Sequence, residues 1–579
     1  MCPRRPKQIC FGPKMLFLNG VRFRAKGDVM WGFGRVWKWN LIFTVGILVF
    51  SACAPEASNT SNNAGAKAPA TPSPAPVLVA DGDWPGYNRT LDGQRFSPLD
   101  QLNTNNVSGL KQVCSFDVGE PGNFQSGIIV VNNALYVTTE TATIAIDPAT
   151  CVQKWKHKIE KPAKEGLRVN RGVAFADGKV FRGLNTGEIV AIDAATGNEL
   201  WRTKFADPEK GESVPASPVA WNGMVFIGQA GGDNKGVRGR MHAFNAADGK
   251  EVWKFALVPM TGQGSETWPA DDPEHPRTGG ATWTSYTIDA SSGQLYIPVG
   301  NAAPDFDIKA RPGLNLYTNS VVILDAKTGA FKEYYQVTPN DFHDWDVSSP
   351  PALIRTSGGK NLVVTAGKDG ILHGIDPAQK KEIYKTPVTT LENVDTPFSE
   401  KDVHFCPGVQ GGVEWNGPSF YPQQNLVFVN SIDWCYTINL MKQSPPPGPA
   451  GAPYTGEADA DEPFGAVDPK EKWKGWVTAV NADDGSVKWK YQSPTPMVAG
   501  ITSTGGGLVF TGDLNGDVLA FNAADGNVLW KNNLGDPIGG GVITYLANNK
   551  QYVAVAAGIT SKSWKTNAGN AKVVVYALP

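Results

Sequence analysis

The 579-residue sequence has few charged residues, only 19% of the total, and its net charge at pH 7 is −2. It contains no basic stripe, so nucleic acid is not an expected partner. Long amphipathic helices are usually rich in Glu, Lys and Leu, whereas this sequence is rich in Gly, Asp, Asn, Thr, Val and Trp. That composition favours many short strands joined by tight turns, and a hydrophobic content of 41% permits a core.

The apolar run near the N-terminus, from Trp39 to Phe50, is too short to span a membrane comfortably. It follows Arg35 and Lys38 and ends at two small residues before Cys53, which resembles a bacterial lipoprotein cleavage box with Phe50 as a poor fit. Residues 1–53 are therefore predicted to be a signal segment with Cys53 as the lipidated residue. Ordinary signal-peptidase cleavage nearby is the alternative.

Residues 54–80 consist mainly of Ala, Pro, Ser and Asn and have almost no large apolar side chain. Such a segment cannot bury a core and is predicted to be a disordered tether. The folded part is expected to span residues 81–579. Together these features predict a location in the periplasm or cell envelope, with membrane contact only through the lipid anchor.

The cysteines lack the CxxC spacing of metal sites, and the histidines lack HxxxH spacing, so a zinc site is a weak alternative. After the predicted signal, an even number remains: Cys114, Cys151, Cys406 and Cys435. In an exported protein this predicts disulfides. Three connectivities are possible, and proximity in the sequence favours Cys114–Cys151 and Cys406–Cys435.

One pattern recurs seven times: an apolar pair, Asp or Asn, small residues, usually Gly, and then an aromatic residue. The copies are AIDPATCVQKW (from Ala145), AIDAATGNELW (Ala191), AFNAADGKEVW (Ala243), ILDAKTGAFKEYY (Ile323), GIDPAQKKEIY (Gly374), AVNADDGSVKW (Ala479) and AFNAADGNVLW (Ala520). Asp or Asn with Gly favours a tight hairpin turn, and the aromatic residue is expected to pack between neighbouring sheets.

Repeats of this length and type predict an all-β propeller. Residues 83–102 are expected to form a lone outer strand and the C-terminal VVVYALP a strand without a hairpin partner, so that both ends close an eighth blade without free sheet edges. The prediction is an eight-bladed β-propeller with tryptophan-docking repeats. The long gaps at 253–323 and 384–479 are expected to carry functional loops.

Four further segments are distinctive: GQAGGDNKGVRG (228–239), GGATWTSYTIDASSGQLYIPVGNAAPDF (279–306), TPNDFHDWDVSSP (338–350) and TAGKDGILHGID (365–376). With the repeats, they resemble the pyrroloquinoline-quinone (PQQ) alcohol dehydrogenase family, similar to methanol dehydrogenase propellers, from about Asp83 to the C-terminus. The repeat alone also occurs in non-catalytic propellers.

The resemblance implies a function for the central residues of these segments. Trp283 corresponds to the tryptophan beneath the quinone, and Asn301 to an amide ligand of calcium. Asp346 corresponds to the catalytic aspartate, also a metal ligand, with Asp344 as a nearby alternative. Lys368 corresponds to the cation near the reactive carbonyl of the quinone, where it would stabilise an oxyanion.

The resemblance assigns the remaining positions less directly. Asp233 is the third metal ligand by position, although many relatives have Glu there. The backbone of Ala230 and Gly231 would line the cofactor, while Pro215 replaces a usual hydroxyl residue. Lanthanide-using relatives carry a second Asp where this sequence has Ser348, which favours Ca²⁺.

Secondary cofactor contacts implied by position are Gln125, Arg171, Glu414 and Trp415. The spacing of Cys406 and Cys435 matches a family disulfide, whereas the adjacent-cysteine disulfide of methanol dehydrogenases is absent. The sequence has no CxxCH haem motif, so electrons are expected to pass to an external acceptor such as cytochrome c. The Pro-rich acidic loop at 443–471 is predicted to be a plain exposed insertion, with a cap or a docking element as the alternative.

The resemblance thus implies a periplasmic quinoprotein dehydrogenase that oxidises an alcohol by hydride transfer to Ca²⁺-bound PQQ. The alternative is a non-catalytic propeller lipoprotein that serves as an outer-membrane assembly scaffold. A third hypothesis, a degenerate enzyme without its metal, rests on Asp233 and Pro215.

Overall fold

The computed structural model describes residues 79–161 and 168–579. The predicted signal 1–53, the lipidation candidate Cys53 and nearly all of the 54–80 tether lie outside the described residues. Helical structure within the described ranges is confined to five 3-10 helices of three residues each: η1 (Val107–Gly109), η2 (Pro208–Lys210), η3 (Ser265–Thr267), η4 (Ile308–Ala310) and η5 (Lys470–Lys472). None of these helices is long or apolar enough to cross a membrane. The prediction of an all-β fold is confirmed for the part of the chain that the structure describes.

Over the described residues, the larger sheets number eight, seven with four strands and one with five. The first four contain β3–β6 (Ile129–Val131, Ala134–Thr138, Ala142–Ile146, Gln153–Lys158), β7–β10 (Ala174–Ala176, Lys179–Gly183, Glu188–Asp193, Glu199–Lys204), β11–β14 (Val219–Trp221, Met224–Gly228, Arg240–Asn245, Glu251–Ala256) and β16, β17, β19 and β20 (Thr287–Asp289, Gln294–Pro298, Ser320–Asp325, Phe331–Gln336).

The other four contain β21–β24 (Ala352–Arg355, Asn361–Ala366, Ile371–Asp376, Lys381–Pro387), β26, β27, β30 and β31 (Ser419–Tyr421, Leu426–Asp433, Lys474–Asn481, Val487–Ser493), β32–β35 (Thr502–Thr504, Leu508–Gly512, Asp517–Asn522, Val528–Asn533), and β36, β37, β38 and β2 (Ile538–Ala547, Lys550–Ala557, Lys572–Ala577, Lys111–Asp117). The short β1 (Phe96–Ser97) adds a fifth, parallel strand beside β32. Smaller sheets join β15 (Thr278–Gly279) to β18 (Ala302–Ala303), and β25 (Val403–Phe405) to β28 (Tyr436–Ile438) and β29 (Ala466–Val467).

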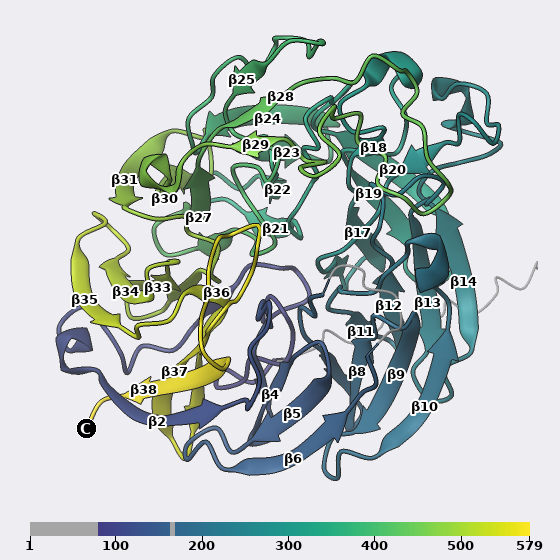
Figure 1. Cartoon of the computed structure of the whole chain (residues 1–579). Helices are drawn as coiled ribbons and strands as arrows, with labels where there is room; N and C mark the ends of the chain where they lie inside the picture. Colours follow the sequence, from purple (N-terminus) through teal and green to yellow (C-terminus); the bar gives the residue numbers. More distant parts are fainter. Residues whose placement is uncertain (1–78, 162–167) are drawn as a thin grey trace, which may run out of the picture. The chain divides into compact units, whose positions relative to one another are not determined.

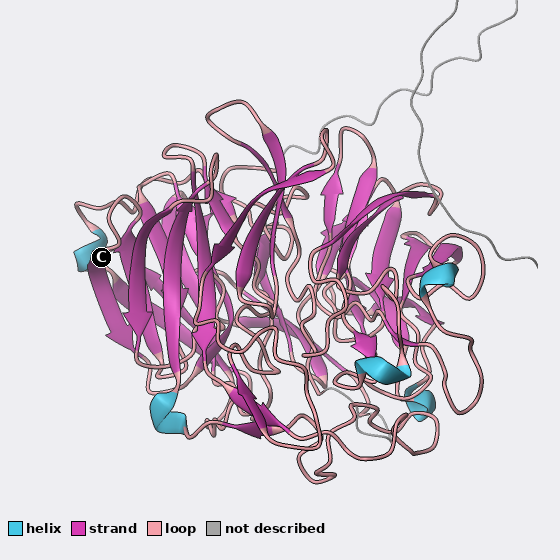
Figure 2. Cartoon of the chain, turned by 90° about the horizontal axis from the view of Figure 1, so that it is seen from above, coloured by secondary structure: helices cyan, strands magenta, loops and turns pink. Residues whose placement is uncertain are grey.

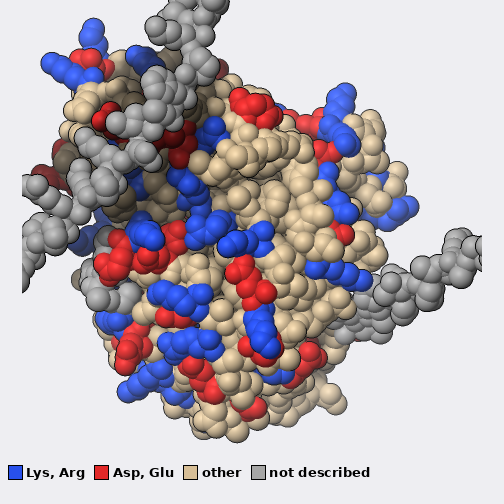
Figure 3. Space-filling model, turned by 90° about the vertical axis from the view of Figure 1, so that its right-hand side faces the viewer, with Lys and Arg blue, Asp and Glu red and all other residues tan. Residues whose placement is uncertain are grey.

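The larger sheets are arranged around a central axis as a β-propeller (Figure 1). The middle strands of the sheets are almost wholly buried, as in β4, β5 and β34. The outermost strands, such as β10 and β14, contain a mixture of exposed and half-buried residues. Loops gather at the two ends of the strands (Figure 2). On the face shown in Figure 3, basic and acidic side chains are interspersed without a stripe of one sign, as expected from the sequence.

The ring is closed by strands from both ends of the described chain: the C-terminal strand is the predicted one, whereas the strand from the other end is not. β2 is the outermost strand and pairs with β38, which carries the C-terminal VVVY segment. The predicted outer strand at 83–102 instead contributes β1 and an isolated bridge between Trp84 and Val130. The prediction that the C-terminal strand lacks a hairpin partner was also wrong, because β38 pairs with β37. The loop before β38 is long, and this hid the hairpin.

Each repeat forms the turn between the third and fourth strands of a sheet. The Asp193 carboxylate accepts hydrogen bonds from the amides of Ala195 and Thr196, and other repeats do the same with Asp or Asn. Gly197 then adopts a φ of 76°, which glycine tolerates best. The Asp or Asn side chain of each repeat therefore stabilises the turn in which it stands.

Four of the repeat tryptophans pack on the turn of the next sheet, whereas Trp530 packs edge-to-face on Tyr576 of the closing sheet. The Trp155 indole donates to the carbonyl of Ala194 at 3.0 Å and lies against Gly197, where an added Cβ would stand 2.8 Å from the ring. The indoles of Trp201, Trp253 and Trp489 make the corresponding hydrogen bonds, to Ala246, Ala326 and Ala523. The glycine thus provides both the turn and the seat for the indole, which confirms the prediction of tryptophan docking.

At the closing junction a disulfide takes the place of this contact. Cys114 stands on β2 opposite Val575, after the same register shift that precedes Trp201 on β10. Its partner Cys151 occupies the glycine position of the first repeat, with a φ of 61°. The predicted bonds Cys114–Cys151 and Cys406–Cys435 are both formed. The covalent bond therefore joins the closing sheet to its neighbour where other junctions use Trp and Gly.

Candidate functional site

The candidate residues lie in loops at one end of the sheets. In a four-stranded antiparallel sheet, the loops after the second and the fourth strand leave from the same end. Loops after a second strand carry Asp233, Asn301 and Lys368, and loops after a fourth strand carry Arg171, Trp283, Asp346, Glu414 and Trp415. The docking turns leave from the opposite end, so the fold separates the chemistry from the contacts that hold the ring.

Lys368 links the two aspartates of the Asp-Trp-Asp segment. Its Nζ lies 2.9 Å from Asp344 Oδ2 and 2.8 Å from Asp346 Oδ2. Asp346 Oδ1 accepts a hydrogen bond from the backbone amide of Asn301 at 2.9 Å. Only glycine fits at position 300, because a Cβ there would stand 2.2 Å from Asp346 Oδ1. The Asp346 carboxylate is therefore held by both of its oxygens.

Two further carboxylates converge with Asp344 beside the Asp346–Lys368 pair. Oxygens of Asp233, Asp305 and Asp344 lie within 4.8 Å of one another. Asn301 Nδ2 donates to Asp305 Oδ1 at 2.9 Å, so the predicted amide ligand lies at the same place. Asp305 Oδ2 and Asp344 Oδ1 are buried and have no hydrogen-bond partner among the described residues. Clustered carboxylate and amide oxygens of this kind suit a hard cation.

Burial and mutual repulsion perturb these acids. Burial, with Asp233 nearby, raises the pKa of Asp305 well above its usual range. Burial also raises the pKa of Asp344, although Lys368 opposes it. For Asp233, burial and the charge of Asp346 raise the pKa to about 6. Burial would lower the pKa of Lys368, but the neighbouring aspartates raise it well above its ordinary value. A positive charge at the centre of the cluster would relieve the repulsion among the acids.

Two tryptophans flank a buried cation next to this cluster. Arg171 Cζ lies 4.5 Å from the ring centre of Trp283 and 5.2 Å from that of Trp415. Arg171 Nη1 donates to the Trp283 carbonyl at 2.9 Å, and its Nε is buried without a partner among the described residues. Lys368 Nζ is 5.9 Å from the Trp283 ring. Burial raises the pKa of Glu414 to about 7 against the opposing charges of Lys368 and Arg171.

The other residues predicted to contact the cofactor, Gln125, Ala230 and Gly231, have less distinctive surroundings. Gln125 Nε2 donates to Asn123, and its buried Oε1 has no partner in the described ranges. The amide and carbonyl of Ala230 both form hydrogen bonds with the backbone of Ser213, so both groups already have partners within the protein. Gly231 adopts a φ of 106° and its carbonyl accepts from Asn234. The structure brings these residues to the same end of the sheets, but these hydrogen bonds do not involve the acidic cluster.

The loop at 443–471 is not the plain exposed insertion that the sequence predicted. Its residues 451–458, here called the strap, run beside the acidic cluster. Tyr454 donates its amide to the Asp233 carbonyl at 2.7 Å and accepts from the amide of Asp305 at 3.3 Å. Thr455 accepts from the amide of Phe306 at 2.8 Å. Backbone pairing leaves no pattern in side-chain composition, which is why a Pro-rich acidic segment appeared fully exposed.

Asp305 is the site residue that sequence reasoning missed. It lies four residues after Asn301 within a segment already matched to the family, and it is completely buried. A second carboxylate so close to an expected ligand was the available signal. Asp344, weighed only as an alternative base, belongs with Asp233 and Asp305.

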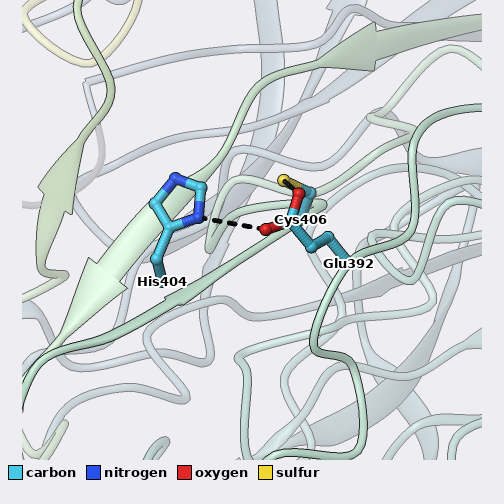
Figure 4. Close-up of side chains that lie close together, drawn as sticks. All are labelled: Glu392, His404 and Cys406. Carbon is cyan, nitrogen blue, oxygen red and sulfur yellow. Dashed lines mark hydrogen bonds and ion pairs between the residues drawn. The ribbon is translucent and has the colours of Figure 1, made fainter.

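A separate group of polar side chains surrounds the Cys406–Cys435 disulfide. His404 lies 3.7 Å from Glu392 Oε1 and 3.4 Å from Asp468 Oδ2, beside Cys406 (Figure 4). Because both cysteines are bonded to each other, neither offers the thiolate that zinc prefers. The weak zinc alternative for the four cysteines was therefore wrong.

Comparison with known proteins identifies the family. The model for the glucose/ethanol/alcohol dehydrogenase β-propeller domain matches residues 84–388, more than half of the chain. The chain belongs to the PQQ-dependent alcohol dehydrogenase family. A second model, for the outer membrane protein assembly factor BamB, matches residues 473–576.

Individual relatives within this family span most of the chain. It is 30% identical over 547 residues to a quinohemoprotein alcohol dehydrogenase from Comamonas testosteroni, covering 85% of this chain and 76% of the relative. It is 29% identical to a lanthanide-dependent methanol dehydrogenase from Methylacidiphilum fumariolicum, covering 83% and 85%. A solved europium-containing methanol dehydrogenase matches with a TM-score of 0.76 and 26% identity, over 86% of this chain and 98% of that one.

Proposed function

We propose that this chain is a quinoprotein dehydrogenase of the periplasm or cell envelope that oxidises an alcohol to an aldehyde or ketone. It would do so with PQQ and Ca²⁺ bound between the loops described above. The observation that carries the proposal is the cluster of half-buried Asp233 with buried Asp305 and Asp344, next to the Asp346–Lys368 pair. We further propose that the eight larger sheets are the eight blades of the propeller.

The side chains present fit both groups. PQQ is flat and carries three carboxylates, and it would need an aromatic surface together with buried donors. Trp283 and Trp415 offer the surface, and Arg171 offers a guanidinium with an unpartnered Nε. For the cation, Asp305 and Asp344 each offer a buried oxygen without a partner in the described ranges.

When bound, the quinone supplies a two-electron acceptor and the cation polarises its carbonyl. The protein's own contribution is to hold and move a proton. Asp346 accepts the hydroxyl proton of the alcohol, and its orientation is set by Asn301 and Lys368. The ammonium of Lys368 stabilises negative charge that develops near the Trp283 ring.

The preference for Ca²⁺ rests on Ser348, whose hydroxyl donates to the Val413 carbonyl at 2.6 Å. Asp305 and Asp344, however, add two carboxylates to the cluster. The affinities for Ca²⁺ and La³⁺ therefore have to be compared directly. As the sequence has no CxxCH motif, electrons would leave to an external acceptor such as cytochrome c.

Nothing in the site favours the scaffold alternative. A binding scaffold has no need of buried carboxylates with raised pKa values, and the match to the BamB model covers only residues 473–576.

The test is alcohol-dependent reduction of a small dye after loading with PQQ and either Ca²⁺ or La³⁺. Asp346→Asn should retain quinone absorbance after gel filtration and lose turnover about 10²-fold or more. Asp305→Asn should instead weaken metal binding, measured directly by calorimetry. The absence of both quinone binding and dye reduction in the unmodified protein, across a broad panel of alcohols, would exclude the proposed function.

A further inference from the structure

We propose that a column of tryptophans leads from the cofactor site to a lysine-rich surface, where an acidic one-electron carrier docks and collects electrons. This inference rests on the proposed function, because it concerns how the reduced site is reoxidised. The column is defined here as Trp415, Trp564, Trp434 and Trp473.

The four indoles are in continuous contact. The ring centres of Trp415 and Trp564 are 5.8 Å apart, those of Trp564 and Trp434 are 4.9 Å apart, and those of Trp434 and Trp473 are 4.9 Å apart. Trp564 and Trp434 are stacked within 6° of parallel, while the other two contacts are edge-to-face. These are favourable aromatic geometries. The inner end, Trp415, is 5.2 Å from the Arg171 guanidinium and thus belongs to the site.

The architecture of the ring does not account for this column. Trp155, Trp201, Trp253, Trp489 and Trp530 stand at the docking positions of the repeats. The column lies instead in connecting segments, and each of its four side chains is at most 3% exposed. Two of those segments, at 470–474 and 561–565, follow the second strand of their sheets and so leave from the end that carries the site. The yellow loop before β38, which contains Trp564, extends towards the middle of the ring in Figure 1.

The outer end of the column lies beneath positive charge. The segments KEKWK (470–474) and SKSWK (561–565) contain one glutamate and five exposed lysines: Lys470, Lys472, Lys474, Lys562 and Lys565. Lys565 Nζ lies 5.4 Å from the Trp473 ring, and Lys470 Nζ is 3.5 Å from the Lys565 carbonyl. One nearby acid, Asp468, pairs with Lys472. A basic patch on a chain of net charge −2 favours an acidic partner.

The electron balance is simple. One alcohol gives two electrons and two protons as it becomes an aldehyde or ketone, and two carrier molecules each take one electron. The protons pass to solvent. The indoles shorten the gaps across which electrons tunnel and are not themselves oxidised. A small dye that enters the site directly needs neither the column nor the lysines.

The first experiment compares two acceptors on the loaded enzyme: a c-type cytochrome with a net negative surface, and a small neutral dye. In the variant with Lys470, Lys472, Lys562 and Lys565 changed to Gln, the KM for the cytochrome should rise about tenfold at low salt, and its salt dependence should flatten. Dye reduction should be unchanged. The matched control changes Lys250, Lys327, Lys381 and Lys488, which lie at the opposite end of the sheets, and should behave like the unmodified protein.

The second experiment tests the column. Trp564→Leu should slow cytochrome reduction severalfold at saturating cytochrome while dye reduction and quinone content are retained, and Trp564→Phe should restore much of the rate. Equal losses with both acceptors, or equal effects of the two lysine variants, would overturn the proposal. Absence of dye reduction in the unmodified enzyme would instead count against the proposed function itself.

Discussion

His373 on β23 is a completely buried imidazole with a carboxylate at each ring nitrogen. Its Nε2 lies 2.8 Å from Asp369 Oδ2 and its Nδ1 lies 2.5 Å from Glu382 Oε1. Burial would lower the pKa of this histidine, but the two carboxylates outweigh it and raise the pKa to about 9. His373 is therefore charged at neutral pH inside the sheet whose loop between the second and third strands carries Lys368.

The raised pKa predicts a loss of stability in mild base. A histidine whose pKa is higher in the folded than in the unfolded protein stabilises the fold fully below about pH 6.5, and this contribution is lost as the pH rises through about 9. For this shift it amounts to at most about 3 kcal/mol. His373→Gln should remove that pH dependence from the free energy of unfolding, measured by denaturant titration between pH 6 and 9.5. The exposed His275→Gln should keep it. An unchanged slope in His373→Gln would contradict the assignment.

Single residues show which parts of the candidate site the sequence pointed to. Asp346, Lys368 and Asn301 were predicted because each stands in a segment whose spacing matches a known family, and the structure places them together. Asp305 and the strap were missed for different reasons. Asp305 has no role in the expected ligand set, and Tyr454 of the strap acts through backbone groups that any residue possesses.

At the level of elements, the repeats were the part of the sequence that best predicted the structure. Turn chemistry and the docking indole both depend on local residue types, so the seven hairpins could be predicted without knowledge of the ring. The closing strand could not. β2 contains no repeat signature, and its pairing with β38 depends on contacts between opposite ends of the chain.

The disulfide in place of a docking tryptophan leads to a prediction. Cys114 and Cys151 occupy the Trp and Gly positions of the junction. Cys114→Ser with Cys151→Ser should lower stability by about 2–4 kcal/mol. Cys114→Trp with Cys151→Gly should recover part of that loss, because it supplies the contact used at other junctions. Thermal unfolding followed by circular dichroism would measure both, and the unmodified protein under reducing conditions gives the reference. No recovery in the Trp–Gly pair would mean that the junction cannot accept an indole.

For the whole molecule, β38 is the strand on which closure depends. It pairs with β37 on one side and β2 on the other, and its residues Val573 to Tyr576 are buried. A chain ending at Ala571 should lose its cooperative thermal transition and expose apolar surface to a hydrophobic dye. Removal of the exposed Pro579 alone should change neither property. A stable, cooperatively folding truncated chain would show that the ring can close without β38.

The pairing of β2 with β38 also fixes an order of events during synthesis. β2 is synthesised long before β38, so it lacks this partner strand while the residues between them are made. Until β38 is made, β2 is open to association with other chains, and a factor that shields it during this interval would determine how much protein folds correctly. This exposure ends when the ring closes, but the yield of folded protein would depend on it.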